Sequence, residues 1–111
     1  MALRRPTLDE IRLLGFLIDK AEGFAVPRDW PARFMVAAMN DEGMGSLRLF
    51  PDGLDASDRR FGRQASECQF TDEDGVEIIA SLNLDQFGNL YELDIWKTNF
   101  EKLIRIPTDW G

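Results

Sequence analysis

Residues 69–97 read QFTDEDGVEIIASLNLDQFGNLYELDIWK, and this stretch decides the fold. Apolar residues recur at every second position from Val76 to Leu84, which is typical of an antiparallel strand with one buried face. Turn-forming residues stand on both sides of this strand, at 72–75 and 86–89, and an alternating run lies beyond each turn. The stretch therefore predicts three antiparallel strands joined by two hairpins.

The lengths of the two loops predict which residues lie opposite one another. The first loop places Phe70 opposite Ile78, and the second, taken as four residues long, places Leu84 opposite Tyr91. In both hairpins the apolar residues then share one side of the sheet. The expected buried side consists of Cys68, Phe70, Ile78, Ala80, Leu82, Tyr91, Leu93 and Ile95.

The opposite side of the same strands is polar and acidic, and one large aromatic residue lies at its edge. It consists of Ser81, Asn83, Asp85, Glu92, Asp94 and Trp96. These residues have no evident structural duty, so we predict that they bind a protein partner. As an alternative, Glu92 and Asp94 with Asp85 would serve as acid and base in a carboxylate-only hydrolase, provided that a cleft raises the pKa of one of them.

Outside this stretch, the sequence predicts one helix near the N-terminus. Thr7 and Glu10 fit a capping box, and apolar residues at spacings of three and four continue the helix from Leu8 to Glu22. The remaining elements are strands at 34–39, 46–50 and 64–71, an irregular mobile segment at 54–62, and a helical turn at 98–104 that returns Phe100, Leu103 and Ile104 to the core. The predicted fold class is α+β: residues 1–111 form a single domain in which the N-terminal helix packs on the apolar face of an antiparallel meander of about five strands.

The charge and composition restrict the possible functions. Thirteen basic and 20 acidic residues give a net charge of −7, which disfavours nucleic acid and anionic membranes as partners. The chain has no histidine and a single cysteine, Cys68, so the Ser-His and Cys-His nucleophile pairs and an intramolecular disulfide are excluded. We therefore predict no enzyme activity and no cofactor. The apolar run at 13–18 is shorter than the ~7 to 15 residues of a secretory signal, so we expect a cytoplasmic protein.

Three smaller patterns are weaker candidates for binding sites. Gly43, Met44 and Gly45 form a loop whose amides would engage a partner or an anion, although ordinary turn geometry also explains it. The cluster Arg59, Arg60 and Arg63 would bind an anion, or else form a solvated loop. Asp72, Glu73 and Asp74 resemble part of a calcium loop, but a hairpin turn is the favoured interpretation and we predict no metal site.

Two segments together resemble a family of small uncharacterised bacterial proteins, a domain of unknown function. They are residues 39–47, MNDEGMGSL, and the C-terminal run that contains YELDIWK at 91–97 and FEKLIRIP at 100–107. The resemblance implies a bacterial, cytosolic, stand-alone domain and supplies no catalytic residues. More loosely, the small acidic chain is similar to immunity proteins of bacterial toxin systems, which implies a basic effector such as a nuclease as its partner.

The leading functional hypothesis is a non-enzymatic protein-binding module. It would use the acidic sheet face or the loop at 43–45 to engage its partner. Two alternatives remain open: a small carboxylate-dependent enzyme or ligand-binding protein, and a structural subunit that forms a homodimer through an exposed strand edge or through Trp110.

Overall fold

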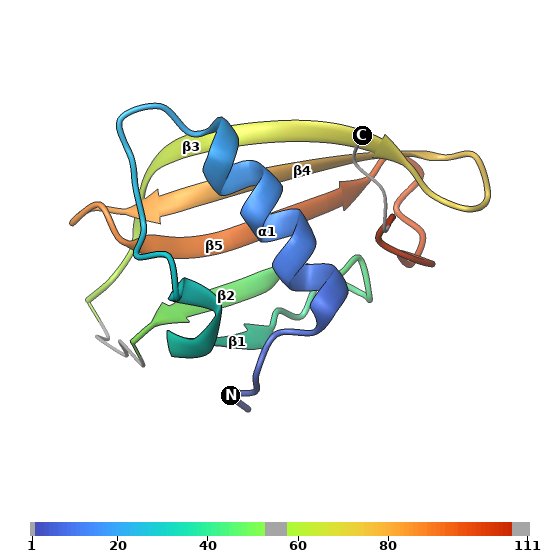
Figure 1. Cartoon of the computed structure of the whole chain (residues 1–111). Helices are drawn as coiled ribbons and strands as arrows, with labels where there is room; N and C mark the ends of the chain where they lie inside the picture. The colour runs from blue at the N-terminus through green and yellow to red at the C-terminus, as the bar shows by residue number, and fades with distance from the viewer. Residues whose placement is uncertain (1, 53–57, 108–111) are drawn as a thin grey trace.

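The computed structural model describes residues 2–52 and 58–107, and there one α-helix lies across a five-stranded antiparallel sheet (Figure 1). The elements are α1 (Leu8–Lys20), the short 3-10 helix η1 (Trp30–Arg33), β1 (Phe34–Ala38), β2 (Leu47–Pro51), β3 (Phe61–Thr71), β4 (Glu77–Asp85) and β5 (Leu90–Lys97). The strand order is β1-β2-β5-β4-β3, so the β1–β2 hairpin docks beside β5 and extends the β3–β5 meander. The predicted α+β class is confirmed. In the described ranges, no helix combines the length and the apolarity needed to cross a membrane.

The helix begins where the capping box predicts. The hydroxyl of Thr7 accepts a hydrogen bond from the amide of Glu10 at 3.1 Å, and the Glu10 carboxylate accepts one from the amide of Thr7 at 2.8 Å. The helix ends at Lys20, two residues before the predicted Glu22, because the backbone is extended at Ala21. Its buried apolar residues are Leu13, Leu14, Leu17 and Ile18, and they cover one face of the sheet.

The register predicted for the first hairpin is confirmed along its whole apolar side. Phe70 lies opposite Ile78, and the amide of Asp72 donates to the carbonyl of Val76 at 2.9 Å across the turn. In the second hairpin the predicted register holds from Ile78 to Asn83 on β4. The core therefore lies between α1 and this face of the sheet. Its fully enclosed apolar side chains include Phe34, Leu13, Leu14, Leu17, Leu47, Leu49, Ile78, Leu82, Leu84, Leu93 and Ile95.

The predicted pairing at the end of the second hairpin is wrong. The register shifts after Asn83, so Leu84 lies opposite Leu90 and no longer opposite Tyr91. Such a bulge adds one residue to β5 and turns the following side chain to the other face. Leu90 takes the place in the core, while the Tyr91 ring packs against the guanidinium of Arg48, 4.4 Å from the ring centroid.

The helical turn predicted at 98–104 is also wrong. The chain makes a single turn at 98–100 and then continues without regular secondary structure to residue 107. Leu103 and Ile106 pack on the core, as apolar residues in this segment should, but Phe100 is 65% exposed and Ile104 is 52% exposed. Only part of the predicted apolar set therefore returns to the core.

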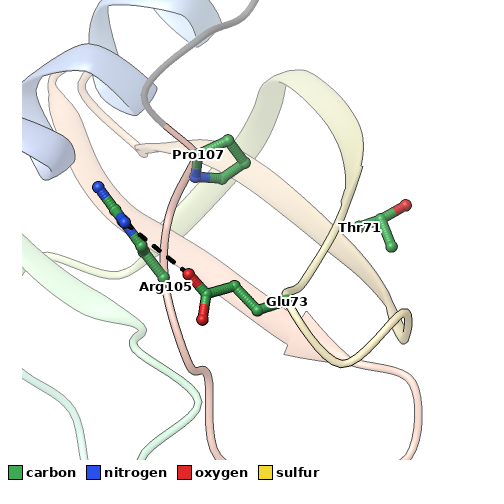
Figure 2. Close-up of a pocket in the computed structure, with 4 residues that line it drawn as sticks. All are labelled: Thr71, Glu73, Arg105 and Pro107. Atoms are coloured by element: carbon green, nitrogen blue, oxygen red, sulfur yellow. Dashed lines mark ion pairs between the residues drawn. The ribbon is translucent and has the colours of Figure 1, made fainter.

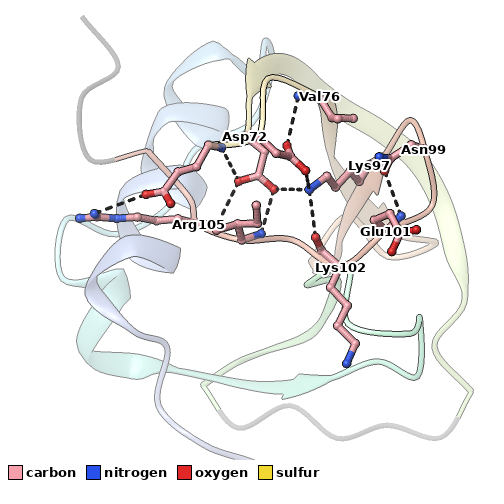
Figure 3. Close-up of polar contacts among 10 residues, drawn as sticks. Asp72, Val76, Lys97, Asn99, Glu101, Lys102 and Arg105 are labelled. Atoms are coloured by element: carbon pink, nitrogen blue, oxygen red, sulfur yellow. Dashed lines mark hydrogen bonds and ion pairs between the residues drawn. The ribbon is translucent and has the colours of Figure 1, made fainter.

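This segment does not form a helix because its amides bond to distant parts of the chain. The amide of Leu103 donates to the carbonyl of Gly43 at 3.1 Å. The amides of Ile104 and Arg105 both donate to the Asp72 carboxylate, at 2.8 and 3.1 Å (Figure 3). These bonds take the place of the bonds to residue i−4 that a helix would require.

Candidate functional site

Five of the six predicted partner-binding residues belong to the side of the sheet that faces away from α1, which we call the open face. Their side chains alternate along each strand with those of the core. The open face consists of Arg48 on β2, Glu92, Asp94 and Trp96 on β5, Glu77, Ile79, Ser81 and Asn83 on β4, and Glu67, Gln69 and Thr71 on β3.

The open face is predominantly acidic. Its carboxylates are Glu67, Glu77, Glu92 and Asp94, and the only cation in the set is Arg48. The guanidinium of Arg48 packs on the ring of Tyr91, and its Nε is buried with no hydrogen-bond partner among the residues that the structure describes. None of the ion pairs described in residues 2–52 and 58–107 involves these carboxylates, so no described ion pair compensates their charges.

The predicted partner-binding residues differ in their accessibility. Asp94 is exposed and Trp96 is 41% exposed, whereas Ser81 and Glu92 are half-buried. Asn83 is buried, and its amide donates to the Glu92 carboxylate at 3.1 Å. Among the predicted partner-binding residues, the accessible ones therefore lie toward the end of β5. Glu67, Gln69, Thr71 and Glu77, on β3 and β4, are also exposed on this face.

Asp85 has the same parity along β4 as Ser81 and Asn83, but it is not accessible to a partner. Its carboxylate is fully buried and accepts hydrogen bonds from Nε of Arg59 at 2.8 Å and from the amides of Phe87 and Asn89 at 2.8 and 2.9 Å. Burial by itself would raise the pKa of Asp85, but these hydrogen bonds outweigh it and lower the pKa. Asp85 therefore holds the β4–β5 turn together through hydrogen bonds that favour its ionised form.

The predicted anion-binding cluster is not a single site. Arg59 is buried, and its guanidinium also donates to the carbonyls of Leu49, at 3.0 Å, and Leu90. It is thereby fixed inside the protein, where it joins β2 to β5. Arg60 and Arg63 are exposed, so they alone remain accessible to an anion.

The loop at Gly43, Met44 and Gly45 lies against the C-terminal segment. At Gly43 a Cβ atom would lie 2.9 Å from Cγ of Lys102, and at Gly45 it would lie 2.9 Å from Cδ2 of Leu103. Both glycines also have positive φ values, 85° and 99°. The structure thus gives this loop an internal packing role.

Replacing Gly45 by alanine is expected to lower the free energy of unfolding by about 2 kcal/mol, through a strained φ and a steric clash with Leu103. The control is Gly75→Ala, because Gly75 also has a positive φ but no atom lies within 4 Å of its Cβ position. Urea unfolding of both variants separates the clash from the strain. Equal losses in the two variants would contradict the close approach at Gly45.

A buried network of charges was missed by the sequence reasoning. The ammonium of Lys97 donates to the carboxylates of Asp72 at 2.9 Å and Asp74 at 2.7 Å, and to the carbonyl of Lys102 at 3.1 Å (Figure 3). Lys97 lies opposite Ile78 on the core side and is fully buried. Lys97 follows Ile95 by two residues and Leu93 by four, so its parity along β5 is that of the core. This parity was the sequence signal that could have predicted its burial. Across residues 2–52 and 58–107, no group of acidic, cysteine or histidine side chains is arranged to hold a metal ion.

A second charged feature borders a shallow pocket of about 240 Å³, lined by Thr71, Glu73, Arg105 and Pro107 (Figure 2). Glu73 and Arg105 form an ion pair across it at 3.8 Å, and more than half of each side chain is exposed. Exposed pairs of this kind are screened by solvent and contribute little stability. The pocket therefore presents two charges that compensate each other.

The sequence predicted Phe100 as a core residue, but its side chain is exposed. Its ring lies beside that of Trp96, with 6.0 Å between the centroids and 55° between the planes. Phe100 has a φ of 64°, a left-handed conformation that bulky residues seldom adopt. An exposed aromatic pair therefore stands where β5 ends.

The fold and the site together define a small α+β domain with one covered sheet face and one open, acidic face that ends in an aromatic pair. The family model of a domain of unknown function, DUF6984, matches residues 3–107, and the chain belongs to this family. No curated protein and no solved structure matches the chain. The matched range contains both sequence segments that carried the resemblance.

Proposed function

We propose that this protein is a non-enzymatic binding module that engages a basic protein partner through the open face. The observation that carries the proposal is the accessible end of that face, where Asp94 and Trp96 are exposed next to Glu92. Carboxylates steer a cationic partner during encounter, and a large aromatic side chain supplies the apolar anchor that most interfaces require.

Two competing functions receive less support. A carboxylate-dependent hydrolase would use Asp85 with Glu92 and Asp94, but the Asp85 carboxylate is already bonded to Arg59 and two backbone amides. A homodimer would form through an exposed strand edge, and the edge strands of the sheet are β1 and β3. On β1, Arg4 already pairs with Val36 through two backbone hydrogen bonds of 2.8 Å, so part of that edge is occupied by the chain itself. The proposed role of Trp110 in a homodimer concerns a residue outside the described ranges.

The proposal is tested by affinity capture with the full chain from an extract of its own cells. Trp96→Ala and Glu92→Lys are expected to reduce partner recovery, and the affinity of the Trp96 variant should fall about 30-fold if Trp96 is an interface hot spot. Glu22→Lys is the control. Glu22 is exposed just after α1 and lies outside the open face, so this substitution changes the charge by the same amount as Glu92→Lys but at another site. Unchanged recovery with both open-face variants would refute the proposed face.

The partner class is a protein with a basic surface. A toxin such as a nuclease has this chemistry, which corresponds to the immunity role that the sequence suggested. Binding should weaken as the salt concentration rises, because exposed charges are screened within about 10 Å at 0.1 M salt.

A further inference from the structure

We infer that Trp96 and Phe100 form an aromatic clamp for one cationic side chain of the partner, an arginine or a lysine. The inference rests on the proposed function and names the group that the open face recognises. It depends on three features of the structure: the geometry of the two rings, the turn that presents Phe100, and the charges around them.

The two rings are close enough to act on one cation. A cation is attracted to the face of an aromatic ring when it lies within about 6 Å of the centroid. The centroids of Trp96 and Phe100 are 6.0 Å apart, so a single cation can meet this distance to both rings. Both side chains are open to solvent, at 41% and 65% exposure. A partner side chain can therefore reach the pair without a rearrangement of the core.

The turn that presents Phe100 is held in a defined shape. The amide of Phe100 donates to the carbonyl of Lys97 at 2.8 Å, and the amide of Glu101 donates to the side chain of Asn99 at 3.0 Å. Phe100 has its left-handed backbone conformation although its ring is not buried. Core packing therefore does not explain the strained conformation, which is the kind of outlier that often marks a functional position.

The base of the same turn is closed by the buried network. The Lys97 ammonium bonds to the carbonyl of Lys102 and thus links the two ends of the turn (Figure 3). Its charge is compensated by Asp72 and Asp74, so it does not oppose a cation at the rings. A ring pair that is fixed before binding loses less conformational entropy when the partner arrives.

The charges nearest the pair also favour a cation. Asp94 precedes Trp96 by two residues on the open face, and Glu101 follows Phe100; both are exposed. The amide of Thr98 donates to the carbonyl of Glu77, which adds a third exposed acidic residue close by. Lys102 is the next basic residue in the sequence, and its side-chain stem packs against Gly43. Three exposed acidic residues, Glu77, Asp94 and Glu101, thus lie in the segments that adjoin Trp96 and Phe100.

The experiment is an NMR titration of the full chain with a hexa-arginine peptide, with hexa-lysine in parallel and hexa-glutamate as the charge control. We expect saturable shifts of the Trp96 indole N–H and of the amides at 94–101 with the cationic peptides only. Phe100→Leu keeps apolar volume but removes the ring, so it should raise Kd at least about fivefold, within the range of cation–π energies. Phe87→Leu is the matched control, because Phe87 is also exposed, at 62%, but lies in the β4–β5 turn.

The outcomes separate the clamp from the proposed function. A loss of affinity in Phe100→Leu but not in Phe87→Leu supports the clamp. If Asp94→Lys abolishes binding while Phe100→Leu and Trp96→Leu leave Kd within twofold of the wild type, the open face binds cations without the rings and the clamp is refuted. The absence of saturable shifts with either cationic peptide at low salt also refutes the clamp, while the affinity capture above still tests the binding module independently.

Discussion

Replacing Asp72 by asparagine is expected to lower the free energy of unfolding by about 3 kcal/mol, since this change breaks a buried ion pair on one side only. The Asp72 side chain is fully buried and accepts bonds from the Lys97 ammonium and from the amides of Glu73, Ile104 and Arg105. Asparagine removes the negative charge and turns one acceptor oxygen into a donor. The variant therefore leaves both the buried lysine and the C-terminal segment with fewer partners.

The effect is measured by urea unfolding, and the melting temperature should fall by about 10 °C or more. Asp74→Asn is the matched control, because Asp74 bonds to the same ammonium but its side chain is 37% exposed. Solvent screens that pair, so its removal should cost clearly less. A loss at Asp74 as large as the loss at Asp72 would show that burial does not govern this network.

The same prediction has a definite pH dependence. Burial by itself would raise the pKa of Asp72, but the bonds from the Ile104 amide and the Lys97 ammonium outweigh it and lower the pKa. A carboxyl group with a lower pKa in the folded chain contributes its full stabilisation above its unfolded pKa of about 4, and this contribution is lost as the pH falls through the folded value. The gap in stability between the wild type and Asp72→Asn should thus be full at pH 7 and shrink below pH 4.

The hairpins were predictable because alternation along a strand fixes which side chains share a face. That logic placed Phe70 opposite Ile78 and Leu82 opposite Leu93 correctly. It failed at Tyr91 because a bulge after Asn83 shifts the register, and loop length alone does not reveal a bulge. Parity thus predicts regular pairing but not its interruptions.

The charged residues were harder to place, because their roles depend on partners that are distant in the sequence. Asp85 alternates with the core residues of β4, which predicted an exposed acidic side chain. It is instead buried in an ion pair with Arg59, 26 residues earlier in the sequence. Lys97 has the parity of the core residues of β5, but a lysine at the end of a strand is usually expected to be exposed to solvent. Phe100 was predicted as a core residue from its apolarity, whereas it has a positive φ and its side chain is 65% exposed. Only the three-dimensional structure brings these groups together.

The second large effect is expected at Arg59, where replacement by methionine should lower the free energy of unfolding by about 3 kcal/mol. The Arg59 side chain is only 3% exposed, and methionine fills part of the space that its stem occupies. The change leaves the fully buried carboxylate of Asp85 without its cation, and the carbonyls of Leu49 and Leu90 without that donor. The junction of β2, β4 and β5 should therefore weaken while the β3–β4 hairpin turn at 72–75 is untouched.

Arg59→Lys is the conservative control. Lysine keeps the positive charge but lacks the planar fork that reaches Asp85 and the two carbonyls together, so an intermediate loss is expected. Urea unfolding of Arg59→Met, Asp85→Asn and the double variant forms a cycle that measures the coupling between the two residues. The double variant should lose clearly less free energy of unfolding than the two single variants together. When both residues are replaced, no unpaired charge remains buried at this position. Strict additivity would mean that the pair does not act as a unit, and the structural role assigned to Arg59 would then fail.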